Sequence, residues 1–182
     1  MNVGANSPED YGDYFAWGEV TPQSSNRYYW DSYKWCNGSN RTMTKYCTDS
    51  YYGNDGFVDN KTVLDAEDDA AHVNWGGDWR MPTRAEFDEL LANTTSEWTS
   101  VNGVNGYKFT SKTNGKSIFL PAAGYRWNGE LSGAGSYGDY WSSTLYEGNP
   151  DDARFLNFGS GGVYRGNGYR YYGISVRPVR QN

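Results

Sequence analysis

Two residue types that build most enzyme and metal centres are almost absent from this chain of 182 residues. It contains one histidine, His72, and two cysteines, Cys36 and Cys47. A zinc site needs several His or Cys ligands close together, and Ser-His-Asp or Cys-His catalysis needs a histidine beside its nucleophile. The sequence therefore argues against both kinds of centre, and we expect no metal, no cofactor and no enzymatic activity.

Long apolar runs and an excess of basic residues are missing as well. A membrane-spanning helix needs a stretch of about 18 apolar residues, and none occurs; the first residues, MNVGANSPEDYGDY, also lack the apolar segment of a signal peptide. The formal net charge is −6 with 16 scattered Lys and Arg, whereas nucleic-acid binding needs a basic patch. We therefore expect neither membrane insertion nor nucleic-acid binding.

Aromatic residues and glycine are abundant instead. Only 37% of the residues are hydrophobic, yet aromatics reach 18%, with 17 Tyr and 8 Trp, and there are 23 Gly. Each buried aromatic removes about 150–250 Å² from water, so a core of Trp, Tyr and Phe can replace scarce aliphatic residues. The glycines favour tight turns and a loop-rich fold. The length predicts a single domain over residues 1–182.

The two cysteines lie close together in WCNGSNRTMTKYC. A disulfide between Cys36 and Cys47 would close a polar loop and contribute roughly 3 kcal/mol. The alternative is a pair of unpaired, partly buried thiols. We favour the disulfide because apolar residues, Trp35 and Tyr46, flank a polar loop, and a disulfide indicates an extracytoplasmic setting.

A first helix is predicted over residues 62–75. Thr62 can cap it, Ala66, Ala70 and Val73 would share its apolar face, and Gly76 would end it. The helix would also carry an acidic group, made of Asp65, Glu67, Asp68 and Asp69. This group fits a solvated helix face near the positive end of the helix dipole, which we favour, or a calcium ligand set.

The second predicted helix has a stronger signature. In MPTRAEFDELLANT, Thr83 and Glu86 have the spacing of a capping box, in which each side chain accepts a hydrogen bond from a backbone N–H. Phe87, Leu90 and Leu91 then form an apolar stripe.

Short strand-like segments follow, among them GYKFTSK, SIFLPAAGYRW, GDYWSST, ARFLNFGS and GISVRPVR. We therefore expect an α+β domain. Its parts would be a loop-rich segment (1–60), two helices (61–97), strands and loops (98–141) and C-terminal strands with a candidate binding region (142–180). In that last part the core is expected to contain Trp141, Leu156, Phe158, Val176 and Val179.

Several segments in the same order resemble the Fibrobacter succinogenes major paralogous domain family. They are NVGANSPEDYGDYFAWGE, WGGDWRMPTRAEFDELL, IFLPAAGYR, GDYWSST, ARFLNF and GISVRPVR. The resemblance implies a C-type lectin-like fold, with two helices and a small twisted antiparallel sheet under long loops, related to formylglycine-generating-enzyme-like domains. It also implies an extracellular or cell-surface location in Bacteroidetes-like bacteria.

Two activities known in that fold are not implied. EGNPDD at 147–152 differs from the EPN-like calcium motif of sugar-binding lectins, and no WND follows it. Formylglycine-generating enzymes need cysteines late in the chain, whereas Cys36 and Cys47 are early.

The block from Ser142 to Arg180 has an unusual composition. It lacks Lys, Met, Gln and Trp and contains one Glu, Glu147. These five types are the ones that no codon ending in a pyrimidine encodes. The block thus resembles the variable region of proteins diversified by diversity-generating retroelements, although an ordinary Gly- and Tyr-rich family segment would look similar.

Tyr, Asn, Gly, Ser and Arg are also typical of antibody-like binding surfaces. We expect ligand contacts from Tyr146, Asn149, Asp151, Asp152, Phe155, Tyr164, Arg165, Asn167, Tyr169, Tyr171 and Tyr172.

The leading hypothesis is a non-enzymatic module that recognises a protein or glycan ligand at a cell surface or on a phage tail. A structural or assembly module is the alternative. A hydrolase using Asp151, Asp152 and Glu147 is disfavoured, because a Gly/Pro-rich loop is not expected to raise a carboxyl pKa by burial.

Overall fold

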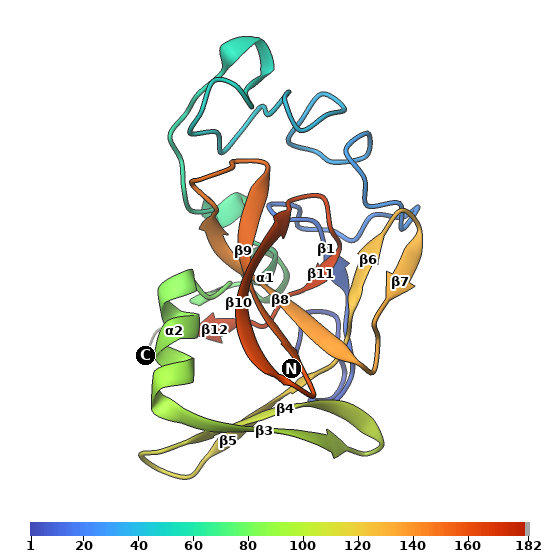
Figure 1. Ribbon diagram of the computed structural model, residues 1–182, viewed down its shortest axis with the longest axis vertical. Helices are drawn as coiled ribbons and strands as arrows, with labels where there is room; N and C mark the ends of the chain where they lie inside the picture. The colour runs from blue at the N-terminus through green and yellow to red at the C-terminus, as the bar shows by residue number, and fades with distance from the viewer. Residues whose placement is uncertain (181–182) are drawn as a thin grey trace.

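A computed structural model describes residues 1–180 and shows a domain built mainly from β-strands (Figure 1). The strands are β1 (Tyr14–Phe15), β2 (Trp79–Arg80), β3 (Thr94–Val101), β4 (Val104–Ser111), β5 (Ser117–Pro121), β6 (Tyr125–Trp127), β7 (Glu130–Ser132), β8 (Tyr137–Leu145), β9 (Asp152–Gly159), β10 (Gly162–Tyr169), β11 (Ile174–Ser175) and β12 (Val179–Arg180). The helices are α1 (Ala70–Trp75), α2 (Arg84–Asn93) and two 3-10 helices, η1 (Asn54–Gly56) and η2 (Ala66–Asp68).

The central sheet has five strands in the order β1-β11-β8-β9-β10. All neighbours in it are antiparallel except β11 and β8. A second sheet, β3-β4-β5, lies at the bottom of the view with α2 rising beside it, and the β6–β7 hairpin lies on the opposite side (Figure 1). The loops of residues 20–60 cover the top, so the ends of β9 and β10 lie beneath them.

The core is aromatic, as the composition predicts. Trp17 and Trp141 are fully buried, and their indole N–H groups donate to the carbonyls of Ser142 and Phe15, each at 2.8 Å. The indole N–H of a buried Trp usually finds such a partner, because an unpaired polar atom is costly to bury. The predicted core residues Trp141, Leu156, Phe158 and Val176 are all buried, whereas Val179 is half-exposed.

The second predicted helix is confirmed as α2. Thr83 caps it by accepting from the Glu86 N–H, and the Glu86 carboxylate accepts from the Thr83 N–H at 2.8 Å. Phe87 is buried against the core cluster that contains Phe158. None of the helices among residues 1–180 is long and apolar enough to span a membrane.

The first predicted helix is wrong in its start. The helix begins at Ala70, because Asp69 rather than Thr62 accepts from the free N–H groups of Ala71 and His72, at 2.8 and 3.0 Å. The Thr62 carbonyl instead accepts from the Leu145 N–H, which ties this segment to the end of β8.

The predicted α+β, C-type lectin-like fold is also wrong. Residues 1–180 form twelve strands in four sheets, and their two α-helices have only six and ten residues. The predicted helix over residues 62–75 was too long at its start, because residues 62–69 lie outside α1. Strand was underestimated at β3, a segment assigned in part to a helix, and at β10, which looks irregular in sequence.

Strand β10 contains three glycines in GVYRGNGY, a composition that disfavours strand. It forms because it pairs with β9 along its whole length, from Gly162 opposite Gly159 to Tyr169 opposite Asp152. The ring of Phe155 also lies across Gly166 and Gly168, where side chains would otherwise stand. An aromatic ring that covers a cross-strand glycine is a known way to stabilise it.

The predicted disulfide is absent. Cys36 and Cys47 are buried free thiols. The Cys36 thiol donates to the Trp30 carbonyl at 3.1 Å, and the Cys47 thiol to the Asp49 carbonyl at 3.1 Å. The loop between them is closed instead by backbone hydrogen bonds, such as that from the Asn37 N–H to the Thr42 carbonyl at 3.0 Å.

Candidate ligand-binding surface

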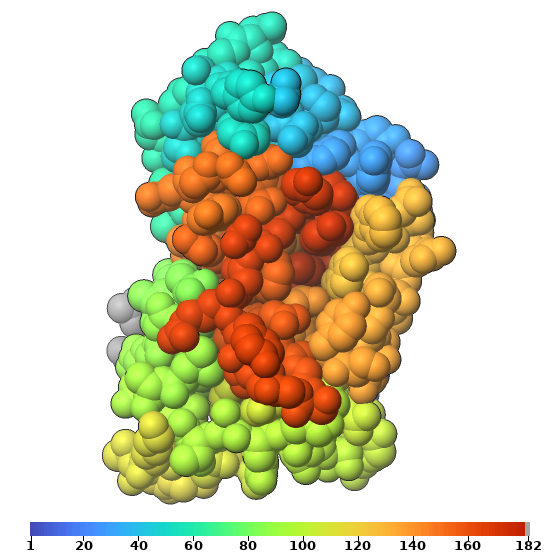
Figure 2. Space-filling view, viewed as in Figure 1, coloured from blue at the N-terminus to red at the C-terminus, as the bar shows by residue number. Residues whose placement is uncertain are grey.

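Two adjoining hollows lie beside strands β9 and β10 and share Tyr172. Figure 2 shows the surface hollowed between the red C-terminal segment and the yellow-orange β6–β7 hairpin. We call this hollow, of about 380 Å³, the aromatic pocket; its lining is Tyr125, Tyr137, Asp139, Phe155, Asn157, Tyr164, Gly166, Tyr172 and Ile174. The polar pocket, of about 470 Å³, is lined by Asn40, Tyr52, Asn149, Asp151, Asp152, Asn167, Gly168, Tyr169 and Tyr172.

Rings from five separate segments form the walls of the aromatic pocket. Tyr125 of β6 lies with its ring centre 5.2 Å from that of Tyr172 and 6.2 Å from that of Tyr137 in β8. Phe155 lies on the β9 side and packs edge-on against the buried Trp141 at 5.7 Å. Tyr164 of β10 is 57% exposed and stands at the edge.

The one charged group of this pocket is Asp139, in β8. Its residue is only 5% exposed, and one carboxylate oxygen accepts from the Asn157 side-chain amide at 2.6 Å. Burial raises the pKa of this carboxyl to about 6, against the opposing effect of the Asn157 hydrogen bond. A carboxylate kept in such surroundings is often functional, because burial disfavours its charged form.

The polar pocket contains a second carboxylate–amide pair. Asp152 accepts from the Asn167 amide at 2.7 Å, and burial raises its pKa to about 6. Burial was not expected to raise a carboxyl pKa in this region, and that expectation is wrong for Asp152, which shares its pocket with Asn40 and Tyr52 of a distant loop. Asn40 of those loops donates to Asp151 at 3.0 Å.

A buried arginine fixes the wall of the polar pocket. Arg170 is fully buried; its guanidinium donates to the carbonyls of Pro150, Tyr46 and Lys45 at 2.9, 3.1 and 3.0 Å, and to the Tyr33 hydroxyl at 2.9 Å. It forms none of the ion pairs found within residues 1–180. One side chain thus joins three segments that are distant in sequence.

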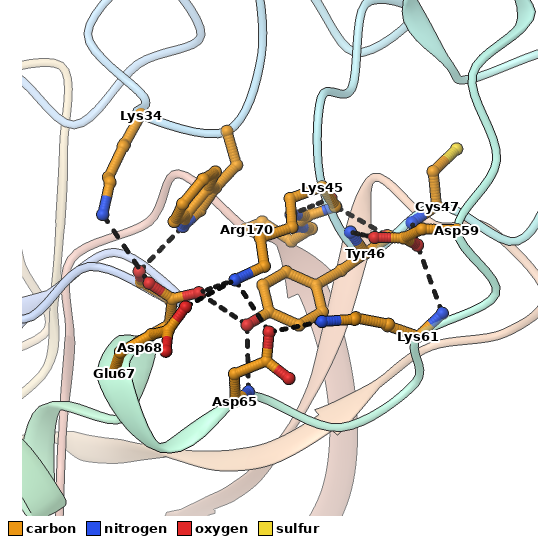
Figure 3. A network of polar contacts seen from close by, with 12 residues as sticks. Lys34, Lys45, Tyr46, Cys47, Asp59, Lys61, Asp65, Glu67, Asp68 and Arg170 are labelled. Atoms are coloured by element: carbon orange, nitrogen blue, oxygen red, sulfur yellow. Dashed lines mark hydrogen bonds and ion pairs between the residues drawn. The ribbon is translucent and has the colours of Figure 1, made fainter.

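The acidic group of residues 65–68 lies outside both pockets. Figure 3 shows its carboxylates around the Lys45 ammonium, at 2.8 Å from Asp65, 2.6 Å from Asp68 and 3.6 Å from Glu67. The prediction that the acidic residues form a solvated helix face is wrong for Asp68, because its side chain is buried. A lysine ammonium, rather than solvent, balances these charges.

Most of the expected contact residues do line the two pockets. The aromatic pocket includes Phe155, Tyr164 and Tyr172, and the polar pocket includes Asn149, Asp151, Asp152, Asn167, Tyr169 and Tyr172.

Three of the expected contact residues lie elsewhere. The Arg165 guanidinium donates a hydrogen bond to the Asp88 carboxylate of α2. The ring of Tyr146 packs against the Arg154 guanidinium, with 4.2 Å between the guanidinium carbon and the ring centre. Tyr171 is 3% exposed and belongs to an aromatic core cluster.

The pocket-lining residues from outside the C-terminal block were not predicted from the sequence; they are Asn40, Tyr52, Tyr125, Tyr137 and Asp139. A signal exists for the last two: alternation along β8 places Tyr137, Asp139 and Trp141 on one face, the face of Phe155 and Asn157 in β9. No local signal indicates that residues 40–52 reach this region.

No curated protein and no solved structure matches the chain. A model of the Lcl C-terminal domain, a Fibrobacter-type paralogous family, matches residues 16–180. This match covers most of the chain and supports the family resemblance of the sequence in its broad form. The chain therefore belongs to the Lcl C-terminal domain family.

Proposed function

We propose that this chain is a non-enzymatic recognition module of a surface or adhesion-like protein. Its ligand, a protein or a glycan, would bind across the aromatic and polar pockets together. The observation behind this proposal is that two hollows with different chemistry meet at Tyr172 and are lined mainly by Tyr, Asn, Asp and Gly. Tyrosine offers a large rigid contact area, and the small polar residues adapt their hydrogen bonds.

The chemistry of the carboxylates favours binding over catalysis. Asp151 and Asp152 each accept from an amide, of Asn40 and Asn167, and so are used in fixing the pocket wall. The single histidine, His72, contacts the Trp79 carbonyl at 3.2 Å and lines neither pocket. An acid–base pair or a histidine-activated nucleophile would need such groups to face a common substrate.

Retroelement diversification of residues 142–180 is a finer part of this proposal. The exposed residues of β10, such as Tyr164, Asn167 and Tyr169, could change without disturbing the core, whereas Leu156 and Phe158 of β9 are fully buried. Isolates should therefore differ at the β10 codons and agree at the β9 core codons. Sequences that vary equally at both would contradict diversification.

Ligand binding is tested by probing glycan and protein arrays with the purified chain. Tyr164→Ala and Tyr169→Ala should each weaken capture by about tenfold, the effect of removing a central aromatic contact. Tyr51→Ala is the matched control, since Tyr51 is 54% exposed but lies outside both pockets. Equal losses in all three variants would contradict the proposed surface.

An assembly module is the second candidate, because β10 is an edge strand of eight residues. Exposed strand edges can pair with another chain. Light scattering across a concentration series separates the two functions. A constant monomer mass favours ligand recognition, whereas a concentration-dependent oligomer that Asn167→Pro abolishes would favour assembly through β10.

A further inference from the structure

The aromatic pocket contains a buried carboxyl group, that of Asp139, with no cationic partner among residues 1–180. The Asn157 amide gives Asp139 one hydrogen bond, but an amide carries no charge to offset that of the carboxylate. Within residues 1–180 no lysine, arginine or histidine forms an ion pair with Asp139. Buried carboxylates are normally paired, because an isolated charge is costly to remove from water.

The walls around this carboxylate favour a particular kind of positive group. Tyr125, Tyr137 and Tyr172 surround the same hollow, and Tyr164 stands at its edge. The faces of aromatic rings attract cations, and cages of several rings recognise organic ammonium groups. Other aromatic faces of this protein already do so: the Lys34 ammonium lies 4.1 Å from the ring centre of Trp35.

Other ligands fit the pocket less well. A calcium ion takes six to eight oxygen ligands, usually from several carboxylates, whereas Asp139 is the one acidic residue in the lining. A neutral sugar could stack on the tyrosines but would leave the buried charge uncompensated. An ammonium group satisfies the carboxylate and the rings together.

We propose that the aromatic pocket binds an organic ammonium group, primary or quaternary, with Asp139 as the counter-charge and the tyrosine rings as the cage. This inference rests on the proposed recognition function and names the chemistry of one part of the ligand. A lysine side chain of a protein and a choline-type headgroup are the two sources of this chemistry.

The test is calorimetric titration of the full chain with lysine amide, with choline and with the uncharged analogue of choline in which carbon replaces nitrogen. At least one of the ammonium probes should bind, and the analogue should bind about tenfold more weakly or not at all. Binding of lysine amide alone indicates a protein source, and binding of choline alone indicates a headgroup. Equal binding of choline and its uncharged analogue would overturn the proposal, as would the absence of binding by both ammonium probes.

Two variants locate the binding site. Asp139→Asn should weaken binding of the ammonium probe by about tenfold or more, since it removes the counter-charge. Asp55→Asn makes the same change at an exposed position in η1 and should leave the affinity for the probe unchanged. Tyr164→Ala removes an exposed ring and should also weaken binding if Asp139→Asn does not fold. Unchanged binding in Tyr164→Ala and Asp139→Asn would overturn the proposal.

The array experiment keeps this inference separate from the proposed function. If the chain captures a ligand in a Tyr169-dependent way but binds no ammonium probe, the recognition function stands and the ammonium site is wrong. If the chain binds the ammonium probe but captures no array ligand, the ammonium site stands and the proposed recognition of a protein or glycan is wrong.

Discussion

At the scale of single residues, Arg170 connects the loop-rich first third of the chain with the segment that follows β10. Its donors go to carbonyls and a hydroxyl rather than to a carboxylate. The rings of Trp17 and Tyr33 lie 5.0 and 5.3 Å from the guanidinium carbon and contribute favourable cation–π contacts. The planar fork of arginine suits this role, because its several donors point to fixed positions.

Arg170→Lys should therefore destabilise the fold although it keeps the charge. An ammonium cannot reach all four oxygen acceptors, so buried carbonyls lose their partners, and we expect a loss of about 3–5 kcal/mol in the free energy of unfolding. Urea denaturation measures it. Arg41→Lys, at an exposed loop position, is the control, and a loss below about 1 kcal/mol in Arg170→Lys would contradict the proposed clamp.

Asp139 should make the protein less stable at neutral pH. Its pKa in the folded state, about 6, lies above its ordinary value of 3.8. The contribution of this group to stability is therefore present below about pH 4 and is lost as the pH rises through 6. Asp139→Asn should remove this fall and raise the free energy of unfolding at pH 7 by about 1–3 kcal/mol.

Urea denaturation of wild type and Asp139→Asn at a series of pH values checks this prediction. The two free energies should converge below about pH 4. A wild type that gains stability between pH 5 and 7 relative to the variant would contradict the burial of this charge. A stabilised variant that no longer binds ammonium would show that the acid is kept for function.

At the scale of elements, β10 depends on a ring from its neighbour. Phe155 occupies the space above Gly166, so a Cβ there would collide with the ring. Gly166→Ala should displace the ring and cost about 1–3 kcal/mol. Gly161→Ala, in the exposed turn between β9 and β10, is the control, since only the Tyr164 hydroxyl lies near its Cβ, at 3.7 Å.

A double-mutant cycle separates this collision from the general effect of replacing a strand glycine. If Phe155 is the obstacle, Gly166→Ala should cost much less in a Phe155→Ala background, with a coupling of about 0.5–3 kcal/mol. Additive effects would mean that the ring does not restrict this position. Thermal unfolding of the four proteins gives the answer.

The two α-helices show which elements can be predicted from sequence. Helix α2 was predictable because its signals are local: Thr83 and Glu86 satisfy each other's backbone across three residues. The end of helix α1 at Gly76 was predictable too, but its start was not, because Asp69 was one of several acidic residues that could begin it. The choice of Asp69 depends on a distant partner, since its carboxylate also accepts from the Met81 N–H at 2.8 Å.

At the scale of the whole molecule, two opposing groups of carboxylates should give stability a maximum in mildly acidic solution. A hydrogen bond from Lys45 lowers the pKa of Asp65 to about 2, and one from Arg80 lowers the pKa of Glu86 to about 2. Their contribution is present above their unfolded pKa values and is lost as the pH falls through 2. Asp139 and Asp152 act in the opposite direction above about pH 4.

We therefore expect the free energy of unfolding to be greatest near about pH 4–5 and to fall on both sides. Urea midpoints from pH 2 to 8 measure this profile. Glu86→Gln should flatten only the acidic side, and Asp152→Asn only the neutral side. A profile that rises steadily to pH 7 would contradict the balance described here.

The sequence by itself determined the composition of the core, helix α2, the region that supplies much of the candidate surface and membership in a paralogous family. These features depend on residue types and local spacing, which the chain order contains directly. Leu156 and Phe158 are buried as their alternation indicates, and Tyr164 and Asn167 lie at pockets as their residue types suggest.

Only the tertiary structure decided the balance of strand over helix, the free thiols of Cys36 and Cys47, and the pairing of Asp139 with Asn157. Each depends on segments far apart in sequence. Gly166 lies in a strand because Phe155 covers it, and Asp139 is buried because residues of β6, β9 and β10 close around it. Long-range packing, which no local pattern records, supplies the free energy for both arrangements.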